Sequence, residues 1–261
     1  MLIQHVGSER RLLIEASRED NMANSTSPKT FVLVHGACHG GWCWKKLTPL
    51  LQATGHSVYT PTQTGLGERS HLLQPGLGLD VFIEDIANVL IWEDLRDVIL
   101  VGHSFGGITI TGLADRMPDR IRHLVYLDSL IVQDGESPMD ILPPEVARAR
   151  QEESLAISGG LTMAVPSPEL FGVTDPADAQ WLHERCTPHP MSTYEDRLPL
   201  RHAVGNGLPV TYIAVTPYYG PTTSSREYAK SRNDWTYLEM AAGHDAMVTN
   251  PQDLASLLLA I

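Results

Sequence analysis

Cysteine is scarce in this chain of 261 residues, which contains only Cys38, Cys43 and Cys186. An odd number of cysteines at wide spacing does not provide the framework of a disulfide-stabilised secreted protein. The scarcity therefore favours a reducing compartment, and we expect to find the protein in the cytoplasm.

Basic residues and long apolar runs are in short supply as well. The chain has 19 Lys and Arg against 31 Asp and Glu, which gives a formal net charge of -12. Nucleic-acid binding needs clustered Lys and Arg, so this balance argues against such a partner. No apolar run approaches the roughly 20 residues of a membrane span, which argues against a membrane partner. The sequence leaves open whether the chain forms a homodimer.

The start of the chain does not have the pattern of a secretory signal, because charged residues stand on both sides of a short apolar run. Met22 provides a second plausible start. We expect residues 1–28 to be a flexible N-terminal extension and residues 29–261 to form the folded domain.

Short apolar strands alternate with helices through most of the remaining chain. The predicted strands cover residues 30–36, 57–61, 97–104, 121–129, 210–215 and 235–241. Helical patterns cover residues 44–56, 79–95, 105–118, 225–232 and 250–261. This alternation predicts an α/β fold with a mostly parallel central sheet and helices on both faces. Residues 131–207 break the alternation and are rich in proline, so we expect them to form an inserted cap.

The strongest motif is Gly102-His103-Ser104-Phe105-Gly106, which matches G-x-S-x-G. It follows a predicted strand and precedes a predicted helix, the context in which this motif places a serine on a sharp turn above the sheet. The two glycines remove side chains that would collide at such a turn. Ser104 is therefore the predicted nucleophile.

A nucleophilic serine needs a base, and it needs donors for the negative charge that develops on the substrate oxygen. His244 follows the last predicted strand and comes after the serine in the chain, so it is the predicted base. The backbone N–H groups of Ala37 and Phe105 are the predicted oxyanion donors. The first lies in the loop after the first strand, and the second directly follows the serine.

The loop after the first strand also contains Cys38, His39 and Cys43, which could be imagined as metal ligands. Their spacing lacks a second pair of ligands, so we expect no metal. His35 and His103 stand next to the oxyanion loop and the serine, and we interpret them as structural braces that donate or accept hydrogen bonds.

The substrate pocket is expected to take residues from the oxyanion loop, from the cap and from the chain next to the base. The predicted pocket residues are Cys38, His39, Trp181 and Met247, with Met163 and Leu182 as further apolar residues of the cap. This set predicts a predominantly apolar pocket for an acyl or aryl group.

Three stretches, "FVLVHGACHGGWCWKKLTPLLQATGH", "VILVGHSFGG" and "GHDAMVTNP", resemble the α/β-hydrolase superfamily. More narrowly they resemble the branch that includes plant methyl-ester esterases, hydroxynitrile lyases and many bacterial esterases. The resemblance extends over about residues 30–261 and implies the α/β-hydrolase fold. It also implies Ser104 as nucleophile, His244 as base and Ala37 and Phe105 as oxyanion donors, with no cofactor.

Two positions depart from the lyase pattern. Hydroxynitrile lyases carry a threonine where this chain has Gly36, and a lysine where it has Asp245. A lyase needs a cation to stabilise the departing cyanide, and Asp245 has the opposite charge. We therefore expect the cleavage of cyanohydrins to be absent or marginal.

The catalytic acid is missing from the position that the family normally uses. The loop after strand 210–215, "TPYYGPTTSS", contains no carboxylate. The strand 121–129 ends in Asp128, and the carboxyl ends of neighbouring strands meet at one edge of an α/β sheet. We therefore expect Asp128 to orient His244, as an acid at this position does in some members of the superfamily. The alternatives are Glu227 and Asp245, or an Asp128 that only caps a turn.

These residues together predict a serine hydrolase that cleaves a small, mainly apolar carboxylic ester, or a related carbamate or amide, through an acyl-enzyme. Two other classes stay open. One is a hydroxynitrile-lyase-like or other non-hydrolytic enzyme on the same scaffold, and the other is a non-catalytic member that binds a small ligand. A protein that only binds has no need of the serine, the histidine and the oxyanion loop together, which favours the hydrolase.

Overall fold

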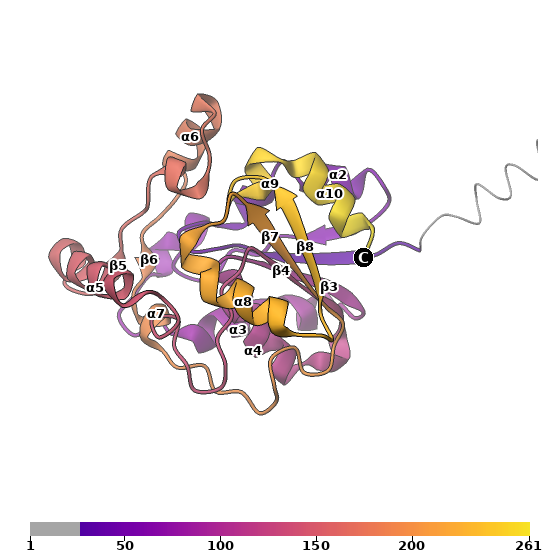
Figure 1. Ribbon diagram of the computed structural model, residues 1–261, viewed down its shortest axis with the longest axis horizontal. Coiled ribbons are helices and arrows are strands. Elements are labelled where there is room, and N and C mark those ends of the chain that lie inside the picture. The colour runs from indigo at the N-terminus through magenta and orange to yellow at the C-terminus, as the bar shows by residue number, and fades with distance from the viewer. Residues whose placement is uncertain (1–26) are drawn as a thin grey trace, which may run out of the picture.

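The computed structural model describes residues 27–261 (Figure 1). The predicted extension, residues 1–28, lies almost entirely outside the described residues and stays a prediction. None of the helices in the described part of the chain is both long and apolar enough to cross a membrane.

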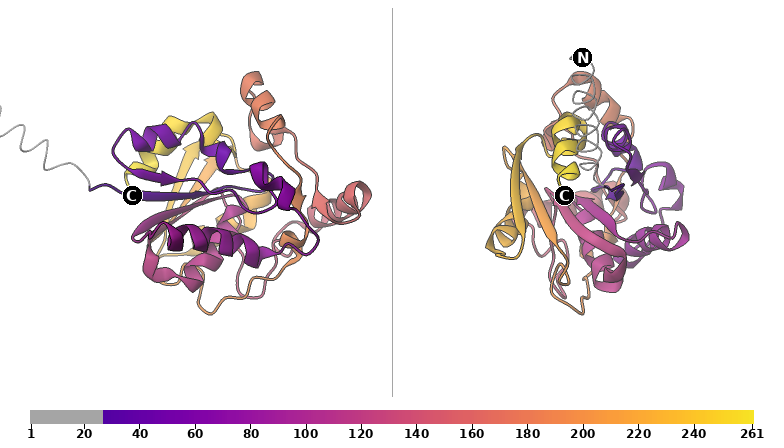
Figure 2. Two further views of the ribbon diagram at one scale, coloured as in Figure 1. Left: turned by 180° about the vertical axis from the view of Figure 1, so that it is seen from behind. Right: turned by 90° about the vertical axis from the view of Figure 1, so that its right-hand side faces the viewer.

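A sheet of six parallel strands forms the centre of the molecule (Figures 1 and 2), in the order β2-β1-β3-β4-β7-β8. Its strands are β1 (Thr30–Val34), β2 (Ser57–Tyr59), β3 (Val98–His103), β4 (Ile121–Leu127), β7 (Val210–Thr216) and β8 (Thr236–Ala241). The sequence prediction of a mostly parallel central sheet is confirmed.

Helices cover both faces of this sheet. One face packs against α3 (Leu79–Trp92), α4 (Gly106–Arg116) and α8 (Thr223–Ser231), and the other against α2 (Thr48–Gln52), α9 (Ala246–Thr249) and α10 (Pro251–Leu259). Successive side chains of a strand point to opposite faces. In β1, Val32 and Val34 enter the first core, whereas Phe31 and Leu33 enter the second. Burial on both faces explains why the strands are continuous apolar runs in the sequence.

The helix predicted over residues 44–56 is shorter in the structure. Gly41–Trp44 forms a 3-10 turn, η1, and α2 begins only at Thr48 and ends at Gln52. Pro49 lies in the first turn of α2, where its missing N–H costs nothing, but it is tolerated poorly further inside a helix. The proline therefore explains why the helix begins late.

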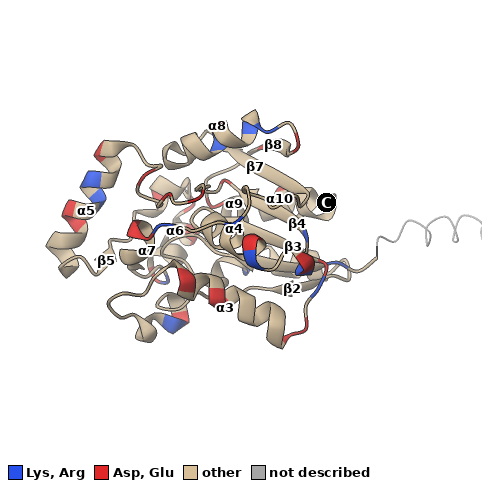
Figure 3. Ribbon diagram, turned by 90° about the horizontal axis from the view of Figure 1, so that it is seen from below, with Lys and Arg blue, Asp and Glu red and all other residues tan. Residues whose placement is uncertain are grey.

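Between β4 and β7 the chain leaves the sheet over the residues predicted as the cap, 131–207 (Figure 1), although Ile131, Val132, Leu198 and Val204 at the two ends of this range pack into the core with α3 and α4. Its elements are α5 (Pro144–Ser158), β5 (Thr162–Met163), the 3-10 turn η4 (Pro168–Phe171), α6 (Pro176–His183), β6 (His189–Pro190) and α7 (Ser192–Glu195). Strands β5 and β6 pair with each other in antiparallel fashion. Helix α5 carries both acidic and basic residues (Figure 3). The remaining 3-10 turns are η2 (Gly67–Leu72), η3 (Pro118–Arg120) and η5 (Gly220–Thr222).

The predicted catalytic side chains lie at one edge of the sheet. Ser104 directly follows β3, Asp128 directly follows β4, and His244 follows β8 after a short turn. Because all these strands are parallel, their carboxyl ends meet, and the cap lies beyond the same edge (Figure 1).

Gly106 allows α4 to begin directly against β1. A Cβ atom at Gly106 would lie 2.7 Å from the carbonyl oxygens of Val34 and His35. We therefore expect Gly106→Ala to destabilise the protein by about 1–3 kcal/mol, because backbone atoms must move to make room. Thermal unfolding would measure the change. Gly220→Ala is the control, since a Cβ there meets no atom within 4 Å. Equal melting temperatures for the two variants would contradict this account.

Candidate active site

Ser104 occupies a strained turn between β3 and α4. Its φ is 51°, in the left-handed region that non-glycine residues seldom adopt. Its N–H donates to the carbonyl of Leu127 at 3.1 Å, and its carbonyl accepts from the N–H of Leu130 at 3.0 Å, so the neighbouring strand holds the turn on both sides. A Cβ at Gly102 would lie 2.7 Å from the carbonyl oxygen of Gly106, which explains the first glycine of the motif.

His244 and Asp128 form a short buried hydrogen bond. The Nδ1 atom of His244 lies 2.6 Å from Oδ2 of Asp128, whose side chain is fully buried. A carboxylate only accepts, so Nδ1 carries a proton and Nε2 is left as the acceptor of the neutral ring. Among the described residues, Nε2 has no hydrogen-bond partner, and the histidine lines the same cavity as Ser104.

Other groups fix the Asp128 carboxylate and the His244 ring in place. Asp128 accepts from the hydroxyl of Thr222 at 3.2 Å, and its own N–H donates to the carbonyl of Ile213 at 2.7 Å. The ring of Tyr219 stacks on His244 with centroids 3.8 Å apart. Both Thr222 and Tyr219 belong to the loop after β7, the loop that lacks a carboxylate.

The two alternative acids lie elsewhere. Glu227 is exposed on α8. Asp245 is fully buried, but its Oδ2 lies 2.9 Å from Nε2 of His39, and neither acid has a hydrogen bond to His244 Nδ1 among the described residues. The geometry therefore brings Asp128, rather than Glu227 or Asp245, to the imidazole of His244.

His39 is positively charged, because both of its ring nitrogens face acceptors. Its Nδ1 lies 2.7 Å from the carbonyl oxygen of Ala37, and its Nε2 faces the carboxylate of Asp245. Burial lowers the pKa of His39, but the attraction of Asp245 outweighs burial and raises the pKa above its usual value. Burial likewise raises the pKa of Asp245, and the charge of His39 reverses this, so that the pKa is lowered. His39 thereby fixes the carbonyl of Ala37 by a hydrogen bond.

The oxyanion loop packs directly against the serine. A Cβ at Gly36 would lie 2.8 Å from Cβ of Ser104, so only glycine fits this backbone. The next residue, Ala37, lines the cavity, and the N–H of Cys38 donates to Nδ1 of His189 at 3.3 Å. Among residues 27–261, the N–H groups of Ala37 and Phe105 make no hydrogen bond. Two free donors are therefore available beside Ser104.

His35 and His103 lie where braces were expected. Nδ1 of His35 donates to the carbonyl of Gly36 at 2.8 Å, and its Nε2 accepts from the N–H of Gln63 at 3.0 Å. Burial lowers the pKa of His35 to about 3, so the ring is neutral. Nε2 of His103 donates to the carbonyl of His244 at 3.0 Å, and burial holds the pKa of His103 well below its usual value.

His103, His244 and Asp245 are also the one group of potential metal ligands within reach of one another in the described part of the chain, with ligand atoms within 4.8 Å. A structural zinc site uses four ligands, and this group offers three. Their hydrogen bonds explain the arrangement, because His103 already donates to a carbonyl and His244 to Asp128. We assign no metal to it.

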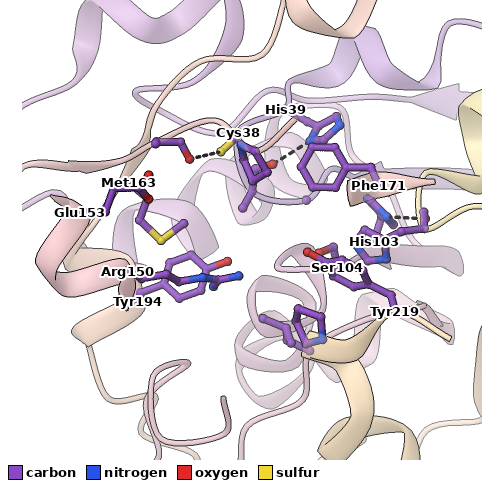
Figure 4. A pocket seen from close by; sticks show the side chains of 17 residues that line it. Cys38, His39, His103, Ser104, Arg150, Glu153, Met163, Phe171, Tyr194 and Tyr219 are labelled. Atoms are coloured by element: carbon purple, nitrogen blue, oxygen red, sulfur yellow. Dashed lines mark hydrogen bonds between the residues drawn. The ribbon is translucent and has the colours of Figure 1, made fainter. Parts of the chain in front are cut away.

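The cavity above Ser104 lies between the sheet edge and the cap (Figure 4). Its wall includes Ala37, Cys38 and His39 from the oxyanion loop, Arg150, Glu153, Met163, Ala164, Pro166, Phe171 and Tyr194 from the cap, and Leu130, Tyr219 and Pro221. Burial raises the pKa of the Cys38 thiol to about 12, so this thiol is protonated and is no rival nucleophile.

Three pocket predictions need correction. Trp181 does not line this cavity, because its ring packs edge-on against Trp42 with centroids 5.1 Å apart. Met247 is fully buried in the core beneath α9. The expected predominantly apolar wall is interrupted by the charged Arg150 and Glu153. Of the other predicted apolar residues, Met163 lines the cavity and Leu182 is buried in the core beneath α9.

The cap touches the loop that carries His244. The N–H of Asp245 donates to the carbonyl of Phe171 at 3.1 Å. A Cβ at Gly172 would lie 2.6 Å from Cα of Gly243, so the two backbones approach as closely as glycine allows. The position of His244 therefore depends on a segment of the cap.

The chain belongs to the alpha/beta hydrolase family, whose family model matches residues 31–257. A carbendazim hydrolyzing esterase of Nocardioides sp. (strain SG-4G) is 40% identical over 243 residues, which cover 88% of this chain and 98% of that protein. Methylesterase 2 of Arabidopsis thaliana is 34% identical over 119 residues, 45% of each chain. The solved structure of an extracellular alpha/beta-hydrolase from a Paenibacillus species superimposes with a TM-score of 0.76. It is 28% identical, covers 89% of this chain and 98% of its own, and is described as homologous in structure and function to tobacco salicylic acid binding protein 2.

The family and the α/β-hydrolase fold predicted from the sequence are thus confirmed. The bacterial relative and the plant methylesterases are esterases by name, which supports esterase activity for this chain. An alpha-hydroxynitrile lyase of Arabidopsis thaliana is also similar, with 37% identity over 113 residues, 43% of this chain and 44% of that protein. These relatives do not by themselves assign its substrate or its catalytic residues.

Breaking the His39–Asp245 pair should destabilise the fold in a pH-dependent way. A raised pKa makes His39 stabilising below its unfolded value of about 6.5, and a lowered pKa makes Asp245 stabilising above about 3.9. The pair therefore contributes most between about pH 4 and 6.5. Its contribution is lost as the pH rises through the folded pKa of His39 or falls through that of Asp245.

We expect Asp245→Asn to cost about 3–5 kcal/mol in that window, since it leaves a buried charge without its partner. Melting temperatures of wild type and variant across pH 4–9 would test this. The exposed Glu84→Gln on α3 is the control. A loss for Asp245→Asn that does not shrink above neutral pH would show that the pair is not ionised.

Proposed function

We propose that this protein is a serine hydrolase that cleaves a small carboxylic ester, or a related carbamate or amide, through an acyl-enzyme. Ser104 is the nucleophile, His244 the base and Asp128 the acid that orients the base. The observation that carries the proposal is the 2.6 Å contact between His244 Nδ1 and Asp128 Oδ2, which leaves Nε2 as an acceptor in the cavity of Ser104.

In the first half of the reaction the Ser104 Oγ attacks the carbonyl carbon, and His244 Nε2 takes the hydroxyl proton. The N–H groups of Ala37 and Phe105 stabilise the oxyanion that forms. As the intermediate collapses, the bond to the leaving group breaks, and that group takes the proton from His244. Water then attacks the acyl-Ser104 ester by the same path, which releases the acid and restores the serine.

Asp128 supports both proton transfers without becoming protonated. It holds the His244 ring in the tautomer whose Nε2 accepts, and it stabilises the imidazolium that forms when the serine proton arrives. Its buried position makes this stabilisation strong, because little water screens the charge pair.

The lyase alternative is disfavoured by the surroundings of the serine. A threonine at position 36 would bring its Cβ to 2.8 Å from Cβ of Ser104 on the present backbone. Asp245 is an anion paired with His39 rather than a cation near the cavity. A protein that only binds a ligand would have no need of a strained serine turn, an oriented base and two free donors.

The substrate class is supported by the relatives. The bacterial relative that is matched over nearly its full length is named for carbendazim, a methyl carbamate, and several of the plant relatives are methylesterases. A short methyl ester or methyl carbamate is therefore the first substrate class to screen.

The three free thiols agree with the reducing compartment expected from the sequence, so cytoplasmic location stays part of this proposal.

Ser104→Ala should lower kcat/KM for a chromogenic short-chain ester by more than roughly a thousandfold, because the nucleophile is lost and the fold is kept. Turnover and a melting curve of the same preparation would be compared. Wild-type turnover by a folded Ser104→Ala variant would refute the assignment.

Asp128→Asn should lower kcat by roughly ten-thousandfold, because an amide at this position favours the wrong tautomer of His244. The same ester assay measures this loss. Glu227→Gln is the matched control, since this acid is exposed on α8, and its kcat should stay near wild type. A larger loss for Glu227→Gln than for Asp128→Asn would reverse the choice of acid.

Cyanide release from mandelonitrile should be absent or marginal, because the residue after His244 is the carboxylate Asp245, paired with His39, and not the lysine of the lyase pattern. A colorimetric cyanide assay with wild type and Ser104→Ala decides this. Efficient release that disappears in Ser104→Ala would establish the lyase instead.

A further inference from the structure

Arg150 is a charged side chain inside the cavity that the reaction above does not use. It belongs to α5 of the cap, and it lines the cavity together with Ser104 and His244. Its side chain lies beside Tyr194 on the wall opposite Ser104, with the guanidinium end toward the interior (Figure 4). The serine and the arginine thus face each other across the space that a substrate would occupy.

The guanidinium of Arg150 has no acid as a partner. No ion pair joins it to any carboxylate in the described part of the chain, although Glu153 of the same helix also lines the cavity. Its Nη1 atom is buried and has no hydrogen-bond partner among residues 27–261. An arginine stays charged in a protein, so a buried N–H of this group without an acceptor costs free energy.

Tyr194 holds the guanidinium in place, whereas the Nη1 atom has no partner. The Cζ atom of Arg150 lies 5.0 Å from the centroid of the Tyr194 ring, which is a cation–π contact, and the two side chains also share a hydrogen bond. The N–H groups of Nη1 are therefore the donors that remain for a ligand.

Two buried carboxylates beside the cavity already have partners. The carboxylate of Asp128 faces His244, and that of Asp245 faces His39. Arg150 and Glu153 of α5 both line the cavity but form no ion pair with each other, and an arginine fork binds a carboxylate through two parallel hydrogen bonds. An anionic acceptor from the substrate would satisfy both the charge and the buried N–H.

We propose that Arg150 is a specificity-determining residue that binds a hydrogen-bond acceptor on the substrate, best a carboxylate, at the end remote from the bond that is cleaved. The preferred substrates are then esters whose acyl part carries such an acceptor, rather than purely apolar esters. This inference rests on the proposed function, because it names the substrate class of the same site.

Three 4-nitrophenyl esters with six-carbon acyl chains test the proposal. They are the hexanoate, which is apolar, the 5-oxohexanoate, which ends in a neutral acceptor, and the adipate half-ester, which ends in a carboxylate. The quantity measured is kcat/KM of each acceptor ester divided by that of the hexanoate. Arg150→Met should lower the ratio for the adipate half-ester at least tenfold and the ratio for the oxohexanoate by less. Comparison with wild type cancels differences in intrinsic reactivity and spontaneous hydrolysis.

Two further variants sharpen the comparison. Arg148→Met removes an exposed arginine two residues away on α5 that does not line the cavity, so both ratios should keep their wild-type values. Arg150→Lys keeps the charge but loses the planar fork, and its adipate ratio should fall between those of wild type and Arg150→Met. If Arg150→Met lowers kcat/KM equally for all three esters, or does not change it, both ratios keep their wild-type values. That result would overturn the proposal and leave Arg150 a packing residue.

A binding measurement separates this inference from the proposed reaction. In a Ser104→Ala background, calorimetry with monomethyl adipate should give a Kd that rises at least tenfold when Arg150→Met is added. Methyl hexanoate, which lacks the carboxylate, serves as the neutral ligand. If Ser104→Ala retains turnover, the proposed function fails, while the ligand comparison still decides the role of Arg150. The same Kd for monomethyl adipate with and without the arginine would contradict the inference.

Discussion

The hydrogen bond between Asp128 and His244 is the contact on which the rest of the site depends. It joins residues that are 116 positions apart, and it forms only because β4 and β8 end at the same edge of a parallel sheet. Strand β7 runs between them, and its loop supplies no acid. Instead Thr222 donates to the Asp128 carboxylate and Tyr219 stacks on the His244 ring. The loop that normally provides the acid here braces an acid that comes from the neighbouring strand.

Two consecutive residues, His244 and Asp245, enter two different buried pairs. His244 turns toward Asp128 and presents Nε2 to the cavity, whereas Asp245 turns away and binds a charged His39. In the proposed reaction the first pair takes part in proton transfer, whereas the second holds the oxyanion loop. Separate partners let one short segment contact both Asp128 and His39.

The sequence was a good guide where a local rule decides the structure. Apolar runs that are buried on both faces indicated the parallel strands, and the glycines around Ser104 indicated the turn. The contact between Asp128 and His244 could be expected from topology alone, because strand ends converge in such a sheet. The position of each side chain in the cap was not predictable in this way. Trp181 turns to Trp42, and Arg150 reaches the cavity, through packing between short irregular elements that have no periodic signal.

The close approach of Gly172 to Gly243 has a consequence for engineering this enzyme. Caps are attractive as exchangeable modules, because a new cap would bring a new specificity to an existing hydrolytic centre. Here the cap backbone rests against the turn that holds His244, the proposed base, so a transplanted cap of different shape would displace that side chain. New substrates are better sought by changing single side chains on α5, which face the cavity without touching that turn, while the stretch around Phe171 and Gly172 is left as it is.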